Sequence, residues 1–299
     1  MLRTRLITAA VLVPIVLLVI ALGEPWISIV VGLLVFLGLA ELISLLDSAG
    51  YDPPQVLVLG TGSAIAAAGL LVANRGNVGG LPADLLRATQ PIGLSLVAVM
   101  AALLLLALAG FSRGDPRKGL SSWAASSFGI VYLCVLAPCI ALVAHLAPVA
   151  GSSASPIGPL GLHSGTAWIL LLVLTVWGYD TGAFLTGRWL GRTHLIDHIS
   201  PSKTVEGLAG GLVLATVAAA LGSWLIGLQA WHPLVLGPLI GLTAQSGDLA
   251  ESMLKRAADR KESGSLIPGH GGVLDRIDSF LFAAPVLAGY ALLVAGYTA

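Results

Sequence analysis

The residues best able to do chemistry in this sequence are concentrated near its C-terminal end, between positions 246 and 279. This segment, SGDLAESMLKRAADRKESGSLIPGHGGVLDRIDS, holds 11 of the 30 charged residues (15 acidic and 15 basic) of a chain in which only 10% of residues are charged. Carboxylates close to lysines and arginines bind divalent cations and neutralise phosphate charge. The segment therefore predicts a site for phosphoryl or nucleotidyl transfer.

Carboxylates in this segment occur in two pairs with helical spacing. Asp248 and Glu251 follow an apolar run and share one helix face with Lys255. Asp275 and Asp278 have the same spacing where the last apolar run begins. Two carboxylates from different helices suit Mg²⁺, which completes its coordination with water and substrate phosphates.

The composition predicts that these residues are carried by a membrane protein. Hydrophobic residues make up 57% of the sequence and the mean hydropathy is +0.94. Because lipid cannot satisfy an open strand edge, we expect an all-α polytopic integral membrane protein. About nine transmembrane helices are expected, at residues 6–22, 26–46, 55–73, 91–110, 122–146, 167–187, 207–227, 234–250 and 279–297.

We expect one integral membrane domain over residues 1–299, with hydrophobic helices in 1–120 and the polar site in 121–299. If the N-terminus is cytoplasmic, only Arg75 and Arg87 fall on the outer face, and the other 13 of the 15 basic residues fall inside. The net charge is zero, whereas a soluble nucleic-acid-binding domain would be basic overall. A small anion or a lipid is therefore the expected partner, and no nucleic acid.

Two further carboxylates fall in or near apolar spans, where ionisable groups are costly and functional by default. Asp180 is at the end of the sixth expected span. It faces a polar cavity or a partner cation, or it makes a structural hydrogen bond between helices. Glu41 is near the end of the second expected span, from which it can reach the headgroup region.

A polar loop follows the sixth span and ends in SPSKTVEG. The side chains of Ser200, Lys203 and Thr204 can hold the oxygens of a phosphate, although the lack of glycines before the lysine excludes a P-loop. Alternatively, the hydroxyl of Ser202 or Thr204 only caps a helix that begins near Val205.

A longer pattern joins these candidates into one motif of 27 residues. It consists of Ser252-x-x-Lys255-Arg256, Lys261, Gly264, Ile267-Pro268, His270-Gly271-Gly272 and Asp275-Arg276-x-Asp278. The motif resembles the signature of the phosphatidate cytidylyltransferases, or CDP-diacylglycerol synthases. Upstream, Asp180-Thr-Gly-Ala183 and Ser200-Pro201-x-Lys203-Thr204-x-Glu206-Gly207 also resemble that family, so the resemblance covers about 177–282. One position departs from the pattern, because Glu262 stands where the family usually has Asp.

The resemblance implies an enzyme that converts CTP and phosphatidic acid into CDP-diacylglycerol and diphosphate, with Mg²⁺ as cofactor. It would act at the cytoplasmic face of the inner (plasma) membrane, and the lipid phosphate would attack CTP directly. The implied metal ligands are Asp248 and Asp275. The implied catalytic residues are Asp248, Lys255, Asp275, Arg276 and Asp278. The implied substrate-binding residues are Asp180, Ser200, Lys203, Thr204, Glu206, Arg256, His270, Gly271 and Gly272.

Two other functions are alternatives to this one. A CTP-dependent lipid-alcohol kinase would transfer the γ-phosphate instead of CMP. An ion-coupled transporter would use Asp180, Asp248 and Glu251 as a cation relay, but no inverted repeat is evident and the charges gather at one membrane face. The sequence leaves open a second cation beside Mg²⁺ and assembly into a homodimer.

Overall fold

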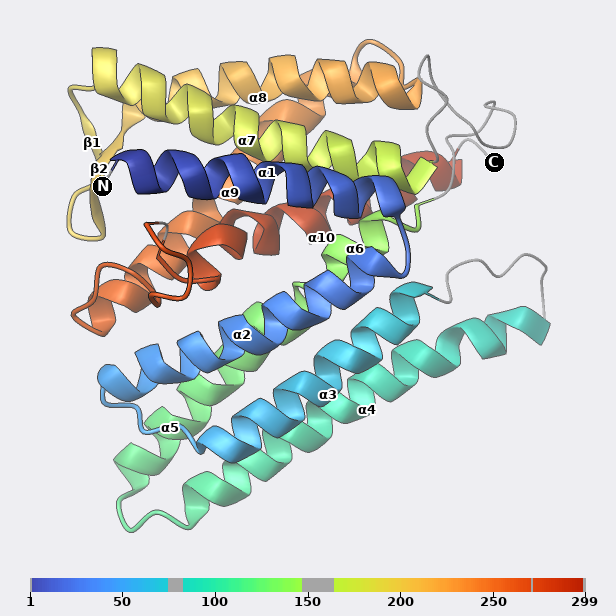
Figure 1. Ribbon diagram of the computed structural model, residues 1–299. Coiled ribbons are helices and arrows are strands. Elements are labelled where there is room, and N and C mark those ends of the chain that lie inside the picture. The colour runs from blue at the N-terminus through green and yellow to red at the C-terminus, as the bar shows by residue number, and fades with distance from the viewer. Residues whose placement is uncertain (1, 75–82, 147–163, 270, 298–299) are drawn as a thin grey trace. The chain divides into compact units, whose positions relative to one another are not determined.

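The computed structural model describes residues 2–74, 83–146, 164–269 and 271–297, which are almost entirely helical (Figure 1). The helices are α1 (Leu2–Leu22), α2 (Trp26–Ser48), α3 (Gln55–Asn74), α4 (Ala83–Phe111), α5 (Pro116–Gly129), α6 (Pro138–Val143), α7 (Ser164–Leu190), α8 (Val205–Ile226), α9 (His232–Ala257) and α10 (Leu274–Tyr297). A π-helical stretch, η1 (Ile130–Val135), separates α5 from α6. Between α7 and α8, strands β1 (His194–Ile196) and β2 (Ser200–Thr204) pair as an antiparallel hairpin.

The chain divides into two compact units, which are described separately. The first unit contains Met1–Val19, Glu24–Leu142 and Leu254–Ile277. The second unit contains Ile20–Gly23, Val143–Met253 and Asp278–Ala299. Helices α9 and α10 therefore contribute residues to both units.

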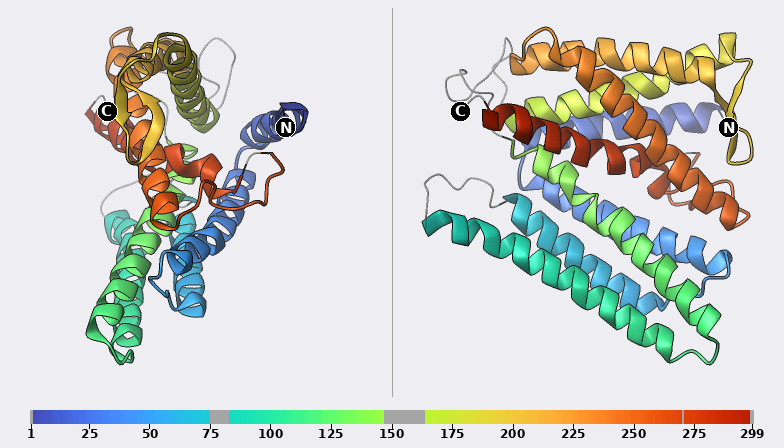
Figure 2. Two further views of the ribbon diagram at one scale, coloured as in Figure 1. Left: turned by 90° about the vertical axis from the view of Figure 1, so that its left-hand side faces the viewer. Right: turned by 180° about the vertical axis from the view of Figure 1, so that it is seen from behind.

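In the first unit, α3 packs against α2, α4 and η1, and α4 packs against α5 (Figures 1 and 2). The core is apolar, with Leu39, Leu42 and Leu133 fully buried. Helix α5 begins where Asp115 accepts a hydrogen bond from the N–H of Arg117 at 2.9 Å, an N-cap that is typical of a helix start. The expected span at 122–146 thus begins earlier, at residue 116, and η1 and the following proline interrupt its regular α-helix.

In the second unit, α7 and α8 pack against each other (Figures 1 and 2), with close backbone approach from Gly187 and Gly207 to Leu171 and Gly222. At Gly182 a Cβ would lie 2.6 Å from the carbonyl oxygen of Gly210 and 2.8 Å from the Cβ of Leu214. Only glycine allows this close approach of the two backbones. Helix α9 packs against α7, where the hydroxyl of Tyr179 donates to Gln245 Oε1 at 2.6 Å.

Helix α8 has a well-defined start and end. Thr204 is its N-cap, and the Oγ1 of Thr204 accepts a hydrogen bond from the N–H of Gly207 at 3.0 Å. Gly227, with φ of +81°, terminates the helix in the left-handed conformation that favours glycine. The prediction of a hydroxyl-capped helix beginning near Val205 is confirmed, with Thr204 as the capping residue.

Several helices have the length and composition to cross a membrane. Within the described residues, five segments qualify: Trp26–Ser48, Pro116–Val143, Ser164–Leu190, Val205–Ile226 and Leu274–Leu293. Shorter apolar helical stretches are Ala10–Leu22, Gln55–Leu71 and Leu96–Phe111. The all-helical prediction is confirmed, whereas the count of nine spans and the cytoplasmic N-terminus stay predictions.

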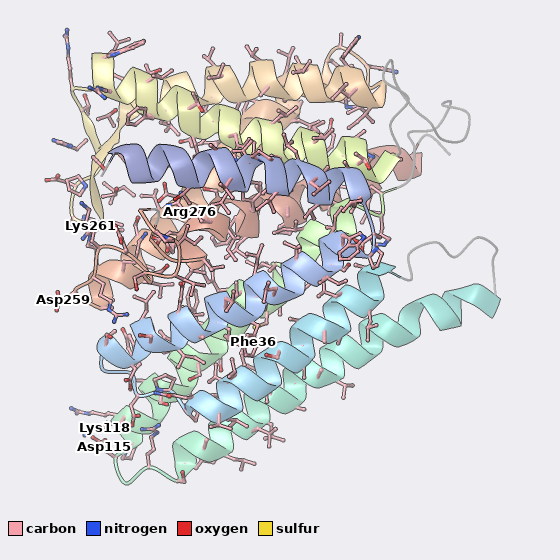
Figure 3. All side chains as sticks on the ribbon, viewed as in Figure 1. Phe36, Asp115, Lys118, Asp259, Lys261 and Arg276 are labelled. Atoms are coloured by element: carbon pink, nitrogen blue, oxygen red, sulfur yellow. The ribbon has the colours of Figure 1, made fainter. Side chains whose placement is uncertain are left out.

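Apolar stripes on the helix surfaces support a lipid environment. On α2, Ile29, Leu33 and Phe36 follow one helix face and are 55%, 56% and 47% exposed (Figure 3 labels Phe36). On α8, Val213 and Val217 are 67% and 59% exposed at the same spacing. Large contiguous apolar surface is rare on soluble monomers and marks contact with lipid or another protein.

Candidate active site

The polar side chains identified from the sequence gather in two clusters, one in each unit. The hairpin cluster, in the second unit, consists of Lys203, Asp248 and Ser252. The loop cluster, in the first unit, consists of Glu41, Lys255, Ser263 and Asp275. Each cluster contains one lysine paired with one of the two carboxylates implied as metal ligands.

In the hairpin cluster, the β1–β2 hairpin carries Lys203 to a carboxylate on α9. The Nζ of Lys203 donates to the Oδ2 of Asp248, and the two side chains are 26% and 22% exposed. The hydroxyl of Ser252, one helical turn further along α9, lies 3.4 Å from the Oδ1 of Asp248. Both charges are partly exposed, so water screens part of their interaction and of the charge left when either partner is lost.

Local contacts fix the hairpin that holds this lysine. The Oε2 of Glu206, in the first turn of α8, accepts hydrogen bonds from the N–H groups of Arg192 and Thr193 at 3.1 and 3.2 Å. The Nδ1 of His194 donates to the carbonyl oxygen of Pro201 at 2.7 Å, across the two strands. Glu206 thus ties the base of the hairpin to α8, and its predicted contact with substrate stays a prediction.

In the loop cluster, four donors surround the carboxylate of Asp275. The Nζ of Lys255 donates to Oδ1 at 2.6 Å, in a pair whose side chains are 12% and 8% exposed. Oδ2 accepts from the N–H and the hydroxyl of Ser263, both at 2.9 Å, and from the N–H of Gly272 at 2.8 Å. These contacts use most of the acceptor capacity of a carboxylate, so Asp275 organises the segment before α10.

The glycines of the loop allow its backbone to reach Asp275. Gly269 and Gly271 have φ of +75° and +78°, in the left-handed region that residues other than glycine rarely adopt. A Cβ on Gly271 would lie 2.6 Å from the Oδ2 of Asp275, and the N–H of Ile267 donates to the carbonyl oxygen of Gly271 at 2.9 Å. The predicted tight backbone is confirmed, whereas His270 lies outside the described residues.

Glu41 was not identified as a site residue from the sequence, and the prediction that it can reach the headgroup region stays a prediction. Its carboxylate accepts hydrogen bonds from the N–H groups of Val273 and Leu274 at 3.0 and 2.9 Å, and its Oε2 lies 3.0 Å from the Oγ of Ser263. The only local signal is that a carboxylate interrupts the apolar sequence of α2. Such an isolated charge predicts a partner but not its identity.

The remaining candidates differ in their accessibility. Arg256 and Arg276 are exposed, and Arg276 is labelled in Figure 3. Asp180 is exposed on α7, while Asp278 is 8% exposed and accepts from the N–H of Ser279 at 2.6 Å. The roles predicted for these residues, and for Ser200, Thr204 and Gly272 as substrate ligands, stay predictions.

The two aspartates differ in how well they suit Mg²⁺. Within the described part of the chain, no group of three or more His, Cys, Asp or Glu side chains is arranged to hold a metal ion. The Oδ1 of Asp248, with its 3.4 Å contact to Ser252, keeps acceptor capacity. The Oδ1 of Asp275 accepts a hydrogen bond from the Nζ of Lys255 at 2.6 Å.

The helices and charged pairs define an all-helical membrane protein with polar groups suited to phosphate chemistry. The cytidylyltransferase family matches residues 3–294. The chain belongs to this family, and the match covers almost the whole length of the chain.

Individual relatives carry a more specific name. The chain is 44% identical over 138 residues to a phosphatidate cytidylyltransferase of Synechocystis sp., a match that covers 46% of this chain and 47% of that protein. It is 44% identical over 125 residues to a phosphatidate cytidylyltransferase of Bacillus subtilis, covering 41% and 46% of the two chains. A protein of the same name from Staphylococcus saprophyticus is 42% identical over 129 residues, covering 42% and 48%. The chain thus spans about half the length of the relatives that it matches.

Proposed function

We propose that this protein is a phosphatidate cytidylyltransferase, which forms CDP-diacylglycerol and diphosphate from CTP and phosphatidic acid. Membership of the cytidylyltransferase family over residues 3–294 is the observation that carries the proposal. The names of the relatives support the lipid substrate. The exposed apolar stripes on α2 and α8 support action on a substrate that is dissolved in a bilayer.

In the proposed reaction, a phosphate oxygen of phosphatidic acid attacks the α-phosphorus of CTP. A new P–O bond forms between the lipid phosphate and the CMP group, the bond between the α-phosphorus and the bridging oxygen breaks, and diphosphate leaves. No protein nucleophile is required, so the protein positions the two phosphates and neutralises their charge. Lys203, Lys255, Arg256 and Arg276 are the cations that we assign to this task, from their chemistry and from the family resemblance.

We further propose Mg²⁺ as the cofactor, with Asp248 and Asp275 as the carboxylates that the family resemblance assigns to it. When bound, Mg²⁺ would neutralise the triphosphate and stabilise charge on the leaving diphosphate. Lys203 and Lys255 are paired with these two carboxylates.

The proposed membrane arrangement has nine spans in the inner membrane, a cytoplasmic N-terminus and a cytoplasmic active site. Ser112, between α4 and α5, would then face the cytoplasm, and Gln229, between α8 and α9, would face outward. Both residues are exposed. The arrangement places 13 of the 15 basic residues inside, as the positive-inside rule favours.

Single cysteines test this arrangement in a background from which Cys134 and Cys139 have been removed. Gln229→Cys is expected to react with a membrane-impermeant thiol reagent added to intact cells. Ser112→Cys is expected to react only after the cells are opened. Labelling of both from the outside, or of Ser112→Cys alone, would contradict the proposed orientation.

Lys203→Met separates the charge of the hairpin from its structural role. The substitution keeps much of the side-chain length and removes the cation, while Thr204 still caps α8. We expect kcat/KM to fall by about tenfold or more, which corresponds to roughly 1.4 kcal/mol of transition-state stabilisation. The apparent melting temperature should change little, because the lysine is partly solvated.

Thr204→Ala is the matched control for this prediction. It removes the cap and should lower the unfolding free energy by ~1 kcal/mol, while leaving the lysine charge in place. Unchanged kinetics for Lys203→Met would mean that Lys203 serves only as the ion-pair partner of Asp248 and does not bind substrate.

Product analysis tests the proposed function itself. Purified protein in detergent is incubated with phosphatidic acid, Mg²⁺ and CTP that carries its label in either the α- or the γ-phosphate. A cytidylyltransferase transfers the α-label to lipid, whereas a CTP-dependent kinase transfers the γ-label.

A further inference from the structure

The carboxylate of Glu41 lies against the backbone that leads into α10, although Glu41 is far from this backbone in the sequence. Its Oε1 accepts a hydrogen bond from the N–H of Val273 at 3.0 Å, and its Oε2 accepts one from the N–H of Leu274 at 2.9 Å and lies 3.0 Å from the Oγ of Ser263. Leu274 is the first residue of α10, so these N–H groups belong to the helix start, where no intrahelical acceptor exists. A carboxylate at this position also interacts favourably with the helix dipole.

The backbone around this carboxylate is shaped to receive it. A Cβ built on Gly264 or on Gly272 would overlap the carboxylate of Glu41. Glycine at both positions, therefore, lets the loop close around an acceptor that comes from α2. A helix-capping side chain usually belongs to the residue just before the helix, whereas here it comes from a different helix in the first unit.

Ser263 connects Glu41 to Asp275. Its Oγ lies 3.0 Å from the Oε2 of Glu41 and 2.9 Å from the Oδ2 of Asp275, and its N–H donates to the same Oδ2 at 2.9 Å. Asp275 in turn receives the Nζ of Lys255 at 2.6 Å. A continuous set of contacts thus runs from Glu41 on α2 to the lysine and the aspartate of the signature.

We propose that Glu41 is a positioning residue that fixes the 263–274 segment and, through Ser263, the orientation of Asp275. The inference rests on the proposed function, and it gives the apolar N-terminal half a part in a reaction whose recognisable motifs all lie beyond residue 177. Glu41 acts through Asp275 and does not contact substrate. A partner that orients a ligand in this way typically contributes about 10- to 100-fold to activity or metal affinity.

Glu41→Gln tests this role with the least change in shape. The NH₂ group of the amide would replace either Oε1, which accepts from the N–H of Val273, or Oε2, which accepts from the N–H of Leu274. In both orientations, the NH₂ group faces a backbone N–H, which is also a donor. We expect kcat to fall by about 10- to 100-fold, and the Mg²⁺ concentration for half-maximal activity to rise, because Asp275 is no longer held in place. A general loss of folded protein would lower kcat without changing the Mg²⁺ requirement.

Hydrogen–deuterium exchange supplies a readout that does not depend on activity. Peptides that cover 263–277 should exchange faster in Glu41→Gln than in the wild type, while peptides from α7 and α8 should not change. Asp47→Asn is the matched control, because Asp47 is an exposed carboxylate on the same helix. This control should leave exchange, kcat and the Mg²⁺ requirement as in the wild type.

Unchanged exchange in Glu41→Gln would overturn the proposal, and so would faster exchange with wild-type kcat and Mg²⁺ dependence.

Ser263→Ala is the second test, for the case in which Glu41→Gln does not fold. It removes the link between Glu41 and Asp275 and keeps the carboxylate of Glu41 at the start of α10. This variant should raise the Mg²⁺ requirement, and wild-type behaviour would overturn the proposal. If the wild type forms no CDP-diacylglycerol, the proposed function fails, and the exchange comparison still decides whether Glu41 holds the segment.

Discussion

Asp275→Asn is expected to lower kcat/KM by about 100-fold or more, equivalent to ~2.7 kcal/mol of transition-state stabilisation. The carboxylate accepts from four donors, which are the Nζ of Lys255, the N–H and hydroxyl of Ser263 and the N–H of Gly272. An amide NH₂ in place of either oxygen would meet a donor. The substitution also removes the negative charge that balances a lysine only 12% exposed, and an uncompensated buried charge is strongly destabilising.

The same contacts predict a loss of stability in this variant. We expect a lower apparent melting temperature in detergent, together with the kinetic defect, because Asp275 holds the loop before α10 as well as serving the reaction. Asp259→Asn is the matched control, since Asp259 is exposed (Figure 3) and its φ of +52° is tolerated by asparagine. Near wild-type turnover of Asp275→Asn at limiting Mg²⁺ would contradict a role of Asp275 in the reaction.

Asp248→Asn is expected to have an effect of similar size on kcat but a smaller effect on stability. Asp248 is 22% exposed and its lysine partner is 26% exposed, so water screens part of the charge that the substitution leaves unpaired. The Oδ1 of Asp248 retains acceptor capacity, which suits a ligand of Mg²⁺. We expect kcat to fall by about 100-fold or more, in the range of losses for groups that stabilise transition-state charge.

The double variant Lys203→Met/Asp248→Asn separates two explanations of that loss. If Asp248 serves only to neutralise Lys203, removing both charges should restore much of the activity. If Asp248 acts on metal or substrate, the double variant should be at least as impaired as Asp248→Asn. Recovery of activity in the double variant would therefore contradict the proposed role of Asp248 as a metal ligand.

The sequence predicted those parts of the structure that depend on local patterns. Long apolar runs predicted helices, since the membrane core leaves no other partner for the backbone. The start of α8 near Val205 was predicted with Ser202 or Thr204 as the alternative caps, and the structure identifies Thr204. The tight loop near Gly271 followed from its glycines. The motif also identified Lys255 and Asp275, although not their mutual pairing.

Contacts between distant residues were not predictable in the same way. Glu41 is 222 residues from Ser263 and 232 residues from Val273, and no local periodicity indicates which loop a lone carboxylate in a helix will meet. The β1–β2 hairpin was also missed, because its strands are short and β2 contains Pro201, a residue that argues against a strand. Pairing of Lys203 with Asp248 depends on this hairpin, so it was missed as well.

The fate of the CTP phosphates tests the central claim most directly. Purified protein is incubated with phosphatidic acid and Mg²⁺, in parallel with CTP labelled in the α-phosphate and CTP labelled in the γ-phosphate, and the lipid and aqueous products are separated. The account predicts α-label in a lipid that is identified as CDP-diacylglycerol, and γ-label only in diphosphate. Transfer of γ-label to the lipid, or the absence of label from the lipid with both forms of CTP, would contradict it.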